Sequence, residues 1–303
     1  MAEIKYEVVE RIAVLDVTPL GFHQTGGEDH ILLRLRTRIT DYTVNDGTQP
    51  IVRGSRDQEK FMTYEWDLLL KDLSADHTVY CLDLLGCGRS DKPNLTYTNY
   101  FYVQLINDFI EHVIHEKTDI IATGLSSSFV LMACSTNPDA YNKIMMINPE
   151  SISNLKCTPS KRSRIIKFIM DLPIVGTAVY NMQMRRENIE YLFTEKYFYN
   201  PFSVSKKTLD IYHEAAHLDE CGGKYLLSSL DGFYLNADIS RALNSINNSL
   251  FILEGRKTEE RERTVEGYVR LNSAVEYDFI ENTEKYPQME NPQAVLEYVD
   301  MFF

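Results

Sequence analysis

Alternating apolar and polar positions mark the first part of the chain. Two runs, 6–17 and 31–39, alternate as half-buried antiparallel strands do, and a further short strand is expected at 49–52. Because successive side chains of a strand point to opposite faces, this alternation predicts one face on a core and one in solvent. We therefore expect an antiparallel hairpin at the edge of a sheet.

From about residue 66 the pattern changes to short apolar runs separated by segments with helical spacing. The runs at 79–85, 119–125 and 143–149 predict buried strands, and the segments at 66–73 and 102–115 predict helices. Strands that alternate with helices imply right-handed βαβ units and a parallel sheet.

The pattern changes again after Glu150. From there to about Asn236 the chain has helical, Tyr-rich segments and no strand-like run. Strand-like runs then resume at 249–255 and 275–281, and the last dozen residues predict a helix. A helical insertion between two parts of one sheet is the simplest account.

This order predicts a core domain interrupted by a cap. We expect the α/β core to comprise 1–150 and 237–303, with 1–37 as a β-rich N-terminal extension, and the helical cap to comprise 151–236. The longest apolar stretch, 172–182, is too short to span a bilayer and is expected to pack within the cap.

Composition narrows the class of protein. The 303 residues are 44% hydrophobic and 25% charged, which is typical of a globular protein. The net charge of −13 disfavours nucleic acid as a partner, because binding to phosphates requires a basic surface. Five scattered cysteines without metal spacing predict free thiols and neither a metal nor another cofactor. The first residues lack an apolar signal region, so we expect a cytoplasmic protein.

Two motifs resemble those of cap-bearing α/β-hydrolases. The segment from Asp83 to Pro93 (DLLGCGRSDKP) is similar to the turn that follows a core strand in that family, where its glycines permit a tight exit from the strand. Further on, Gly124-Leu125-Ser126-Ser127-Ser128 lies between a predicted strand and a predicted helix. It resembles the family's nucleophile elbow, in which small residues flank the catalytic serine. The resemblance implies the α/β-hydrolase fold, with Ser126 as nucleophile at the top of the sheet.

The resemblance also implies an oxyanion hole. In the family one backbone N–H comes from the residue after the nucleophile, here Ser127. The other follows a His-Gly pair at the end of the third strand, and the corresponding pair here is Arg53-Gly54, which makes Ser55 the second donor. Side-chain substitutions leave backbone donors in place.

The general base of the family has no counterpart in this chain. Family members carry Gly-His-x-P-x-x-E-x-P after the last strand, and this chain has EKYPQMENP at 284–292. The aligned Pro and Glu residues place Lys285 where the family has histidine. A lysine acts as base only when it is neutral, which requires burial or a nearby positive charge. The neighbouring carboxylates of Glu281, Glu284 and Glu259 would keep it protonated.

The acid member is not fixed by the sequence. The family usually places an aspartate three residues after the glycine that ends the strand at 249–255, and Thr258 stands there. Glu259 or Glu260 substitutes after a shift of one or two residues, although 259–263 also fits a solvated helix start. Glu150, after the preceding strand, is the alternative.

The cap is expected to roof an apolar pocket over Ser126. Its many aromatic residues favour a ligand chamber, and His213 and His217 share a helix face without a third metal ligand. We expect the pocket to include Arg53, Leu125, Tyr199, Tyr212 and His213.

Two functions follow as hypotheses. One is an ester, thioester or amide hydrolase with an altered base. The other is a hydrolase-like protein that binds a small apolar or acyl-type molecule, or a protein partner, without turnover. The sequence predicts no membrane span and leaves the oligomeric state open.

Overall fold

The computed structural model describes residues 64–88, 90, 92–217 and 221–303, together with the backbone of three strands at 10–16, 39–44 and 50–52. Arg53, Ser55 and most of the alternating run 31–39 lie outside the described residues.

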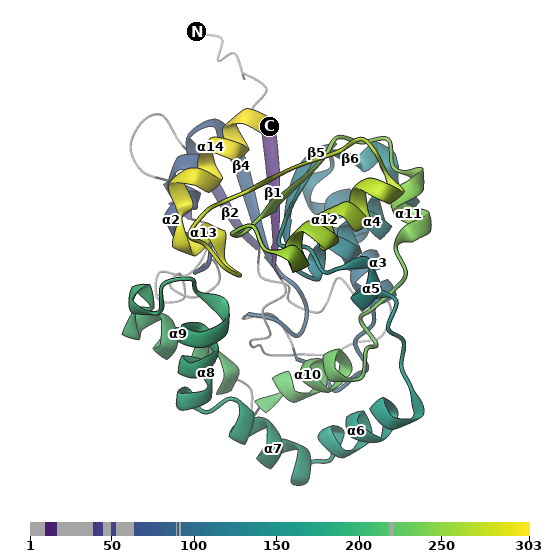
Figure 1. Cartoon of the computed structure of the whole chain (residues 1–303), viewed down its shortest axis with the longest axis vertical. Coiled ribbons are helices and arrows are strands. Elements are labelled where there is room, and N and C mark those ends of the chain that lie inside the picture. Colours follow the sequence, from purple (N-terminus) through teal and green to yellow (C-terminus); the bar gives the residue numbers. More distant parts are fainter. Residues whose placement is uncertain are drawn as a thin grey trace, which may run out of the picture.

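An eight-stranded sheet forms the centre of the molecule, in the order β3-β2-β4-β1-β5-β6-β7-β8 (Figure 1). The strands are β1 (Glu10–Asp16), β2 (Ile39–Val44), β3 (Pro50–Val52), β4 (His77–Asp83), β5 (Thr118–Thr123), β6 (Tyr141–Ile147), β7 (Leu250–Glu254) and β8 (Val275–Phe279). Neighbours from β4 to β8 are parallel, whereas β2 pairs antiparallel with β4 and with β3. The predicted fold class, a mostly parallel sheet flanked by helices, is confirmed.

The position of β1 corrects one prediction. The alternating run 6–17 was expected in an antiparallel edge hairpin, but β1 lies in the middle of the sheet and is parallel to both β4 and β5. Its residues Ile12–Leu15 (IAVL) are a continuous apolar run, which is typical of strands in the interior of parallel sheets. The antiparallel edge is formed by β2 and β3 instead.

Helices cover both faces of the sheet, and further helices lie beyond one of its ends. The helices that the structure describes are α2 (Asp67–Asp76), α3 (Asn99–Phe109), η1 (Ile110–Ile114), α4 (Ser126–Thr136), η2 (Pro138–Ala140), α5 (Ile152–Leu155), α6 (Lys161–Asp171), α7 (Val175–Gln183), α8 (Arg186–Leu192), η3 (Phe193–Tyr197), η4 (Pro201–Ser203), α9 (Lys206–His217), α10 (Gly223–Asp231), α11 (Ser240–Ser245), α12 (Glu259–Leu271), α13 (Pro287–Glu290) and α14 (Pro292–Phe302). Side chains of α3, α4, α11 and α12 pack on one face, and those of α2 and α14 pack on the other.

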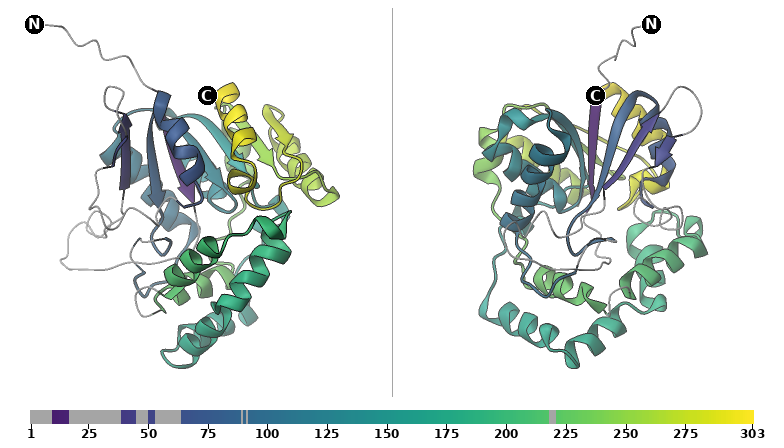
Figure 2. Two further views of the ribbon diagram at one scale, coloured as in Figure 1. Left: turned by 90° about the vertical axis from the view of Figure 1, so that its left-hand side faces the viewer. Right: turned by 180° about the vertical axis from the view of Figure 1, so that it is seen from behind.

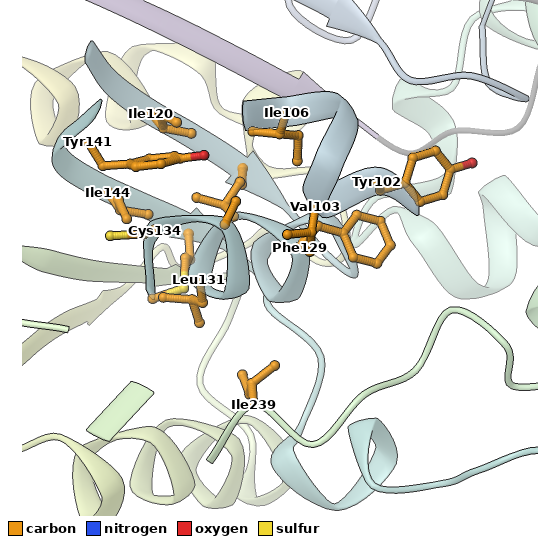
Figure 3. Packing of buried hydrophobic residues seen from close by; sticks show 14 of the residues in the cluster. Tyr102, Val103, Ile106, Ile120, Phe129, Leu131, Cys134, Tyr141, Ile144 and Ile239 are labelled. Carbon is orange, nitrogen blue, oxygen red and sulfur yellow. The ribbon is translucent and has the colours of Figure 1, made fainter. Parts of the chain in front are cut away.

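The strands divide their side chains between two apolar cores. In β5, Ile120 belongs to the core under α3 and α4, while Ile121 belongs to the core under α2 and α14. The first core contains stacked aromatic rings, with Tyr102 and Phe129 5.0 Å apart between centroids (Figure 3). Burial of such side chains from water contributes about 1.5–3 kcal/mol each, so the two cores fix the strand-to-helix turns at the sheet edge.

Between β6 and β7 the described chain consists of helices and connections. Helices α6 to α10 form an arc beyond one end of the sheet (Figures 1 and 2). A third apolar cluster, which includes Ile189, Phe193 and Leu209, holds α8, η3 and α9 together and also takes in Tyr286 from the C-terminal part of the chain. We refer to α6 to α10 as the cap, since they lie where the sequence predicted a helical insertion.

The structure also answers two smaller questions. All five cysteines are free thiols. Among the described helices, none is by itself long and apolar enough to cross a membrane. Helices α6 and α7, which meet at a bend, reach that length and apolar composition only when they are counted together.

Candidate functional site

A chamber of about 610 Å³ lies between the cap and the ends of β5 and β6. The core contributes the turns after these strands and the segment before α13, and the cap contributes α7 to α10 with η3. The lining residues are Thr123, Gly124, Leu125, Asn148, Glu150, Gln183, Met184, Asn188, Ile189, Tyr191, Leu192, Phe193, Tyr197, Tyr212, Ala216, Leu227, Leu230, Asp231, Lys285 and Tyr286.

Gly124 occupies the strained position of the turn between β5 and α4. It follows the last residue of β5 directly, and its φ of +50° lies in the left-handed region. Its N–H donates to the carbonyl of Ile147 over 2.9 Å, which ties the turn to the end of β6. A Cβ built on Gly124 would meet no atom within 4 Å, so this backbone position faces open space in the chamber wall.

Ser126 lies elsewhere than predicted. It is the first residue of α4, its φ is not positive, and it does not line the chamber. The residue is fully buried, and its Oγ makes no hydrogen bond to any residue that the structure describes. The expectation that Ser126 forms the pocket floor is therefore wrong, because the helix has already begun at this residue and turns its side chain into the protein.

The N–H of Ser127, expected as the first oxyanion donor, is also placed differently from the prediction. The N–H of Ser127 donates to the Gly124 carbonyl over 3.3 Å within the turn, and the Ser127 hydroxyl contacts the Ala122 carbonyl over 3.3 Å. The N–H of Ser127 is therefore already occupied. The residue after the left-handed position is Leu125, which lines the chamber as predicted, and its N–H makes no hydrogen bond within the described part of the chain.

The second expected donor, Ser55, was placed after a pair that ends the third strand, at 49–52. In the structure this strand is β3 at the edge of the sheet, with β2, β4 and β1 between it and β5. Arg53 and Ser55 follow β3 and lie outside the described residues. The assignment of these two residues stays a prediction.

Lys285 does line the chamber, but its surroundings differ from those expected. Its Nζ lies 4.5 Å from the centroid of the Tyr197 ring, and its backbone N–H donates to the Tyr197 carbonyl over 2.9 Å. The side chain is exposed, and no carboxylate among the described residues pairs with it. Glu284 instead binds Arg256 at 2.7 Å and Arg261 at 3.0 Å.

Glu259 stands at the exposed start of α12. Its carboxylate pairs with Arg263 at 2.9 Å, and Thr258 caps the helix by accepting from the N–H of Arg261 over 3.4 Å. Glu259 does not line the chamber. The surroundings of Glu259 are therefore those of a solvated helix start and not those of the acid in a catalytic triad.

At the end of β7 the carboxylate of Glu254 is buried. The residue is 2% exposed, and its Oε1 has no hydrogen-bond partner among the described residues. Burial raises its pKa to about 8, against the effect of Arg261 and with that of Glu150. Glu150, the alternative acid from the sequence, does line the chamber. Its backbone carbonyl accepts from the Tyr268 hydroxyl over 2.8 Å.

Asn148, for which no sequence motif predicts a role, connects the segments that follow β6, β7 and β8. It has a φ of +45° directly after β6, and its Oδ1 accepts from the N–H of Gly255 over 2.8 Å. Its Nδ2 donates to the carbonyls of Glu284 and Lys285 over 3.0 and 2.9 Å. Asn148 thereby holds Lys285 at the chamber wall.

Of the three aromatic cap residues expected in the pocket, one is there. Tyr212 lines the chamber, and its hydroxyl donates to Glu65 of the core. Tyr199 lies outside the lining and stacks under Arg256 at 5.2 Å. His213 is also outside and contacts the His217 ring at 4.4 Å, and desolvation lowers its pKa. No histidine in the described part of the chain lines the chamber, and no group of three or more described His, Cys, Asp or Glu side chains is arranged to hold a metal ion.

Comparison with known proteins agrees with this geometry at the level of the fold. A family model for the alpha/beta hydrolase fold matches residues 59–164. No curated protein matches the chain. The family match covers about a third of the chain, and together with the strand order it shows the alpha/beta hydrolase fold.

Solved structures share the fold at low identity. The serine hydrolase CarC, which is involved in carbazole degradation, is 12% identical with a TM-score of 0.65, over 96% of this chain and 90% of that one. The 2-hydroxy-6-oxo-6-phenylhexa-2,4-dienoate hydrolase from Rhodococcus sp. strain RHA1 is 14% identical with a TM-score of 0.63, over 97% and 90%. The epoxide hydrolase CorEH is 16% identical with a TM-score of 0.64, over 97% and 91%.

Proposed function

We propose that this α/β-hydrolase-fold protein binds a small, mainly apolar molecule in the chamber under its cap and does not turn it over through Ser126. The observation that carries the proposal is the turn after β5. Its left-handed residue, which in an active elbow carries the nucleophile into the pocket, is Gly124 and has no side chain.

The lining of the chamber supports an apolar ligand. Most of its side chains are aliphatic or aromatic, among them Ile189, Leu192, Phe193 and Leu230. Pockets for small molecules combine such walls with a few polar groups that orient the ligand. A volume of about 610 Å³ lies within the usual range of such sites.

Two polar groups of the wall suit a carbonyl or acyl oxygen. The N–H of Leu125, which has no acceptor among the described residues, precedes the first turn of α4, where the helix dipole favours negative charge. The exposed ammonium group of Lys285 lies over the ring of Tyr197, a cap residue that also lines the chamber. A molecule with one polar end and an apolar body is therefore the expected ligand class.

Hydrolysis through Ser126 is the competing function. It would require the buried Oγ of Ser126 to leave α4 and reach the chamber, and the described lining offers no histidine to activate it. A serine without its base retains only the rate that oxyanion stabilisation and binding provide.

A fluorophosphonate probe separates the two functions. We expect no labelling of the purified protein that depends on Ser126, so the Ser126→Ala variant should match the parent. In parallel, an apolar fluorescent probe should bind the parent and bind more weakly to Leu192→Trp, which fills the chamber. Leu68→Trp is the matched control because Leu68 is exposed on α2. Rapid labelling that disappears in Ser126→Ala would establish the hydrolase instead, and equal probe binding by the two Trp variants would contradict the chamber as the site.

A further inference from the structure

Helices α6 and α7 carry an exposed apolar surface at the end of the molecule farthest from the sheet (Figures 1 and 2). We call this surface the outer cap face and define it as Ile165, Ile166, Phe168, Ile169, Ile174 and Val175. Phe168 is 66% exposed and Ile174 is 84% exposed. Contiguous exposed apolar side chains of this kind mark interaction sites rather than ordinary surface.

The polarity of α6 is inverted relative to a helix that packs on a protein core. Its buried side consists of Ser163, Lys167 and Met170, and the Lys167 ammonium binds Asp171 at 2.7 Å and approaches the hydroxyl of Ser228 at 3.4 Å. A second buried lysine, Lys224 of α10, donates to Thr177 of α7 over 2.9 Å. Two of the three buried side chains of α6 are therefore polar, while its aliphatic and aromatic side chains other than Met170 face out. A surface helix normally shows the opposite arrangement.

Positive charge accompanies the outer cap face. Residues 156–186 contain seven Lys and Arg residues and one acidic residue, Asp171, in a chain whose net charge is −13. Lys161, Arg162 and Arg164 are exposed on the first turn of α6, and none of them forms an ion pair with a described residue. We infer that the outer cap face docks on the surface of an anionic lipid bilayer, with its apolar side chains at the acyl boundary and these basic side chains at the headgroups.

The shape and charge of the face favour a bilayer over other occupants. The two helices bend by 95° at their junction, so Ile174 and Val175 lie at a corner of the surface. Neither helix is long enough to cross the membrane, so the expected contact is interfacial. A second copy of the chain would bring the same basic side chains against each other. This inference concerns a surface separate from the chamber and does not depend on the proposed ligand.

Tryptophan fluorescence provides a direct test on the full chain. The only native tryptophan, Trp66, is buried against α14 in the core and supplies a constant background. In Phe168→Trp, emission should shift to shorter wavelength when vesicles of phosphatidylcholine with phosphatidylserine are added. Vesicles of phosphatidylcholine alone should give a much smaller shift. Met301→Trp is the matched control, since Met301 is 66% exposed on α14 at the opposite side of the molecule, and its emission should not move.

Cosedimentation of the otherwise unmodified protein with the same vesicles completes the test. Each of Lys161→Ser, Arg162→Ser and Arg164→Ser should weaken binding about fivefold, the effect of roughly 1 kcal/mol per basic residue. Ile165→Ser with Phe168→Ser should abolish it, while thermal unfolding of all variants confirms that they are folded. Equal binding to neutral and anionic vesicles, or no binding to either, overturns the inference. A dimer in light scattering that Phe168→Ser dissociates would assign the face to a second copy of the chain and overturn it as well.

Discussion

Gly124 and Ser126 are two residues apart and lie on opposite sides of the turn between β5 and α4, with Gly124 at the chamber and Ser126 inside the protein. One turn thus separates Gly124, which faces the chamber, from the hydroxyl of Ser126, which the sequence predicted as the nucleophile. The two residues lead to separate predictions, because Gly124 has no side chain at the chamber and the Ser126 hydroxyl has no hydrogen-bond partner among the described residues.

Ser126→Ala should leave the free energy of unfolding unchanged or raise it by up to about 1 kcal/mol. The hydroxyl of Ser126 is buried without a hydrogen bond in the described structure, and a buried polar group in that state costs roughly 1–3 kcal/mol, which the loss of its packing partly offsets. Urea denaturation measures the effect. Ser128→Ala is the control, because the Ser128 hydroxyl donates to the Leu125 carbonyl over 2.8 Å and its loss should destabilise by about 1 kcal/mol. A larger loss of stability for Ser126→Ala than for Ser128→Ala would show that the Ser126 hydroxyl has a hydrogen-bond partner.

Gly124→Ser should place a hydroxyl in the chamber. The open space at this position admits the side chain, but a non-glycine residue at a φ of +50° should cost roughly 1–2 kcal/mol in the free energy of unfolding. We expect this variant to react slowly with a fluorophosphonate, at a rate above that of the parent, because the hydroxyl is accessible and unactivated. Mass spectrometry of the labelled peptide locates the adduct. An adduct on Ser126 in either protein would contradict the assignment of the two positions.

The stability of the protein should fall as the pH rises from about 4.5 to about 8. Burial raises the pKa of Glu254 from its ordinary value of 4.5 to about 8, so the folded protein binds a proton that the unfolded chain releases over this range. Each unit by which the pKa of Glu254 differs between the folded and unfolded protein changes the free energy of unfolding by about 1.4 kcal/mol, which gives a few kcal/mol at most. Glu254→Gln should flatten the curve and be more stable than the parent above pH 8. Urea titrations at several pH values test this, with Glu259→Gln as the control for removal of an exposed carboxylate. An equal change of slope in both variants would contradict the role of Glu254.

Lys167→Met should lower the free energy of unfolding by roughly 2 kcal/mol. The substitution keeps the apolar stem and removes the ammonium group that binds Asp171, but Asp171 retains the hydrogen bond of 2.6 Å from Ser228 and some contact with solvent. Lys161→Met, at the exposed start of the same helix, should change stability by less than about 0.5 kcal/mol. Thermal or urea unfolding of the pair measures the difference. Similar effects at both positions would mean that the buried side of α6 does not depend on its polar contacts.

The sequence predicted the fold where local pattern and tertiary role coincide. The apolar runs of β4, β5, β6 and β7 and the spacing of α3 and α14 each match the place of the element in the sheet or on its faces. It misplaced β1 because the sequence of an interior strand in a parallel sheet differs from that of an edge strand by only a few apolar residues. Pairing over a long stretch of chain, rather than local alternation, decides between them.

The elbow shows why the site was harder to predict than the fold. The segment Ala122-Thr123-Gly124-Leu125-Ser126 also fits the pattern of a small residue, any residue, a central residue, any residue and a small residue. The choice of Ser126 as the centre followed from the presence of a hydroxyl. The signal that favours the other register is the direct succession of Gly124 to the strand, because a glycine accepts the left-handed turn without strain. Glu254 and Asn148 had no signal, since their roles depend on residues distant in sequence.

The central place of β1 has a consequence for how the chain is assembled. Both neighbours of β1, the strands β4 and β5, follow it at a long distance in the sequence, so one of its hydrogen-bonding edges stays open until β4 is made and the other until β5 is made. Contacts of such long sequence separation slow folding and leave a strand exposed to pairing with other chains. The sheet therefore closes around a strand that precedes both of its partners, and a shortened chain without Glu10–Asp16 would lack the strand that joins the two halves of the sheet.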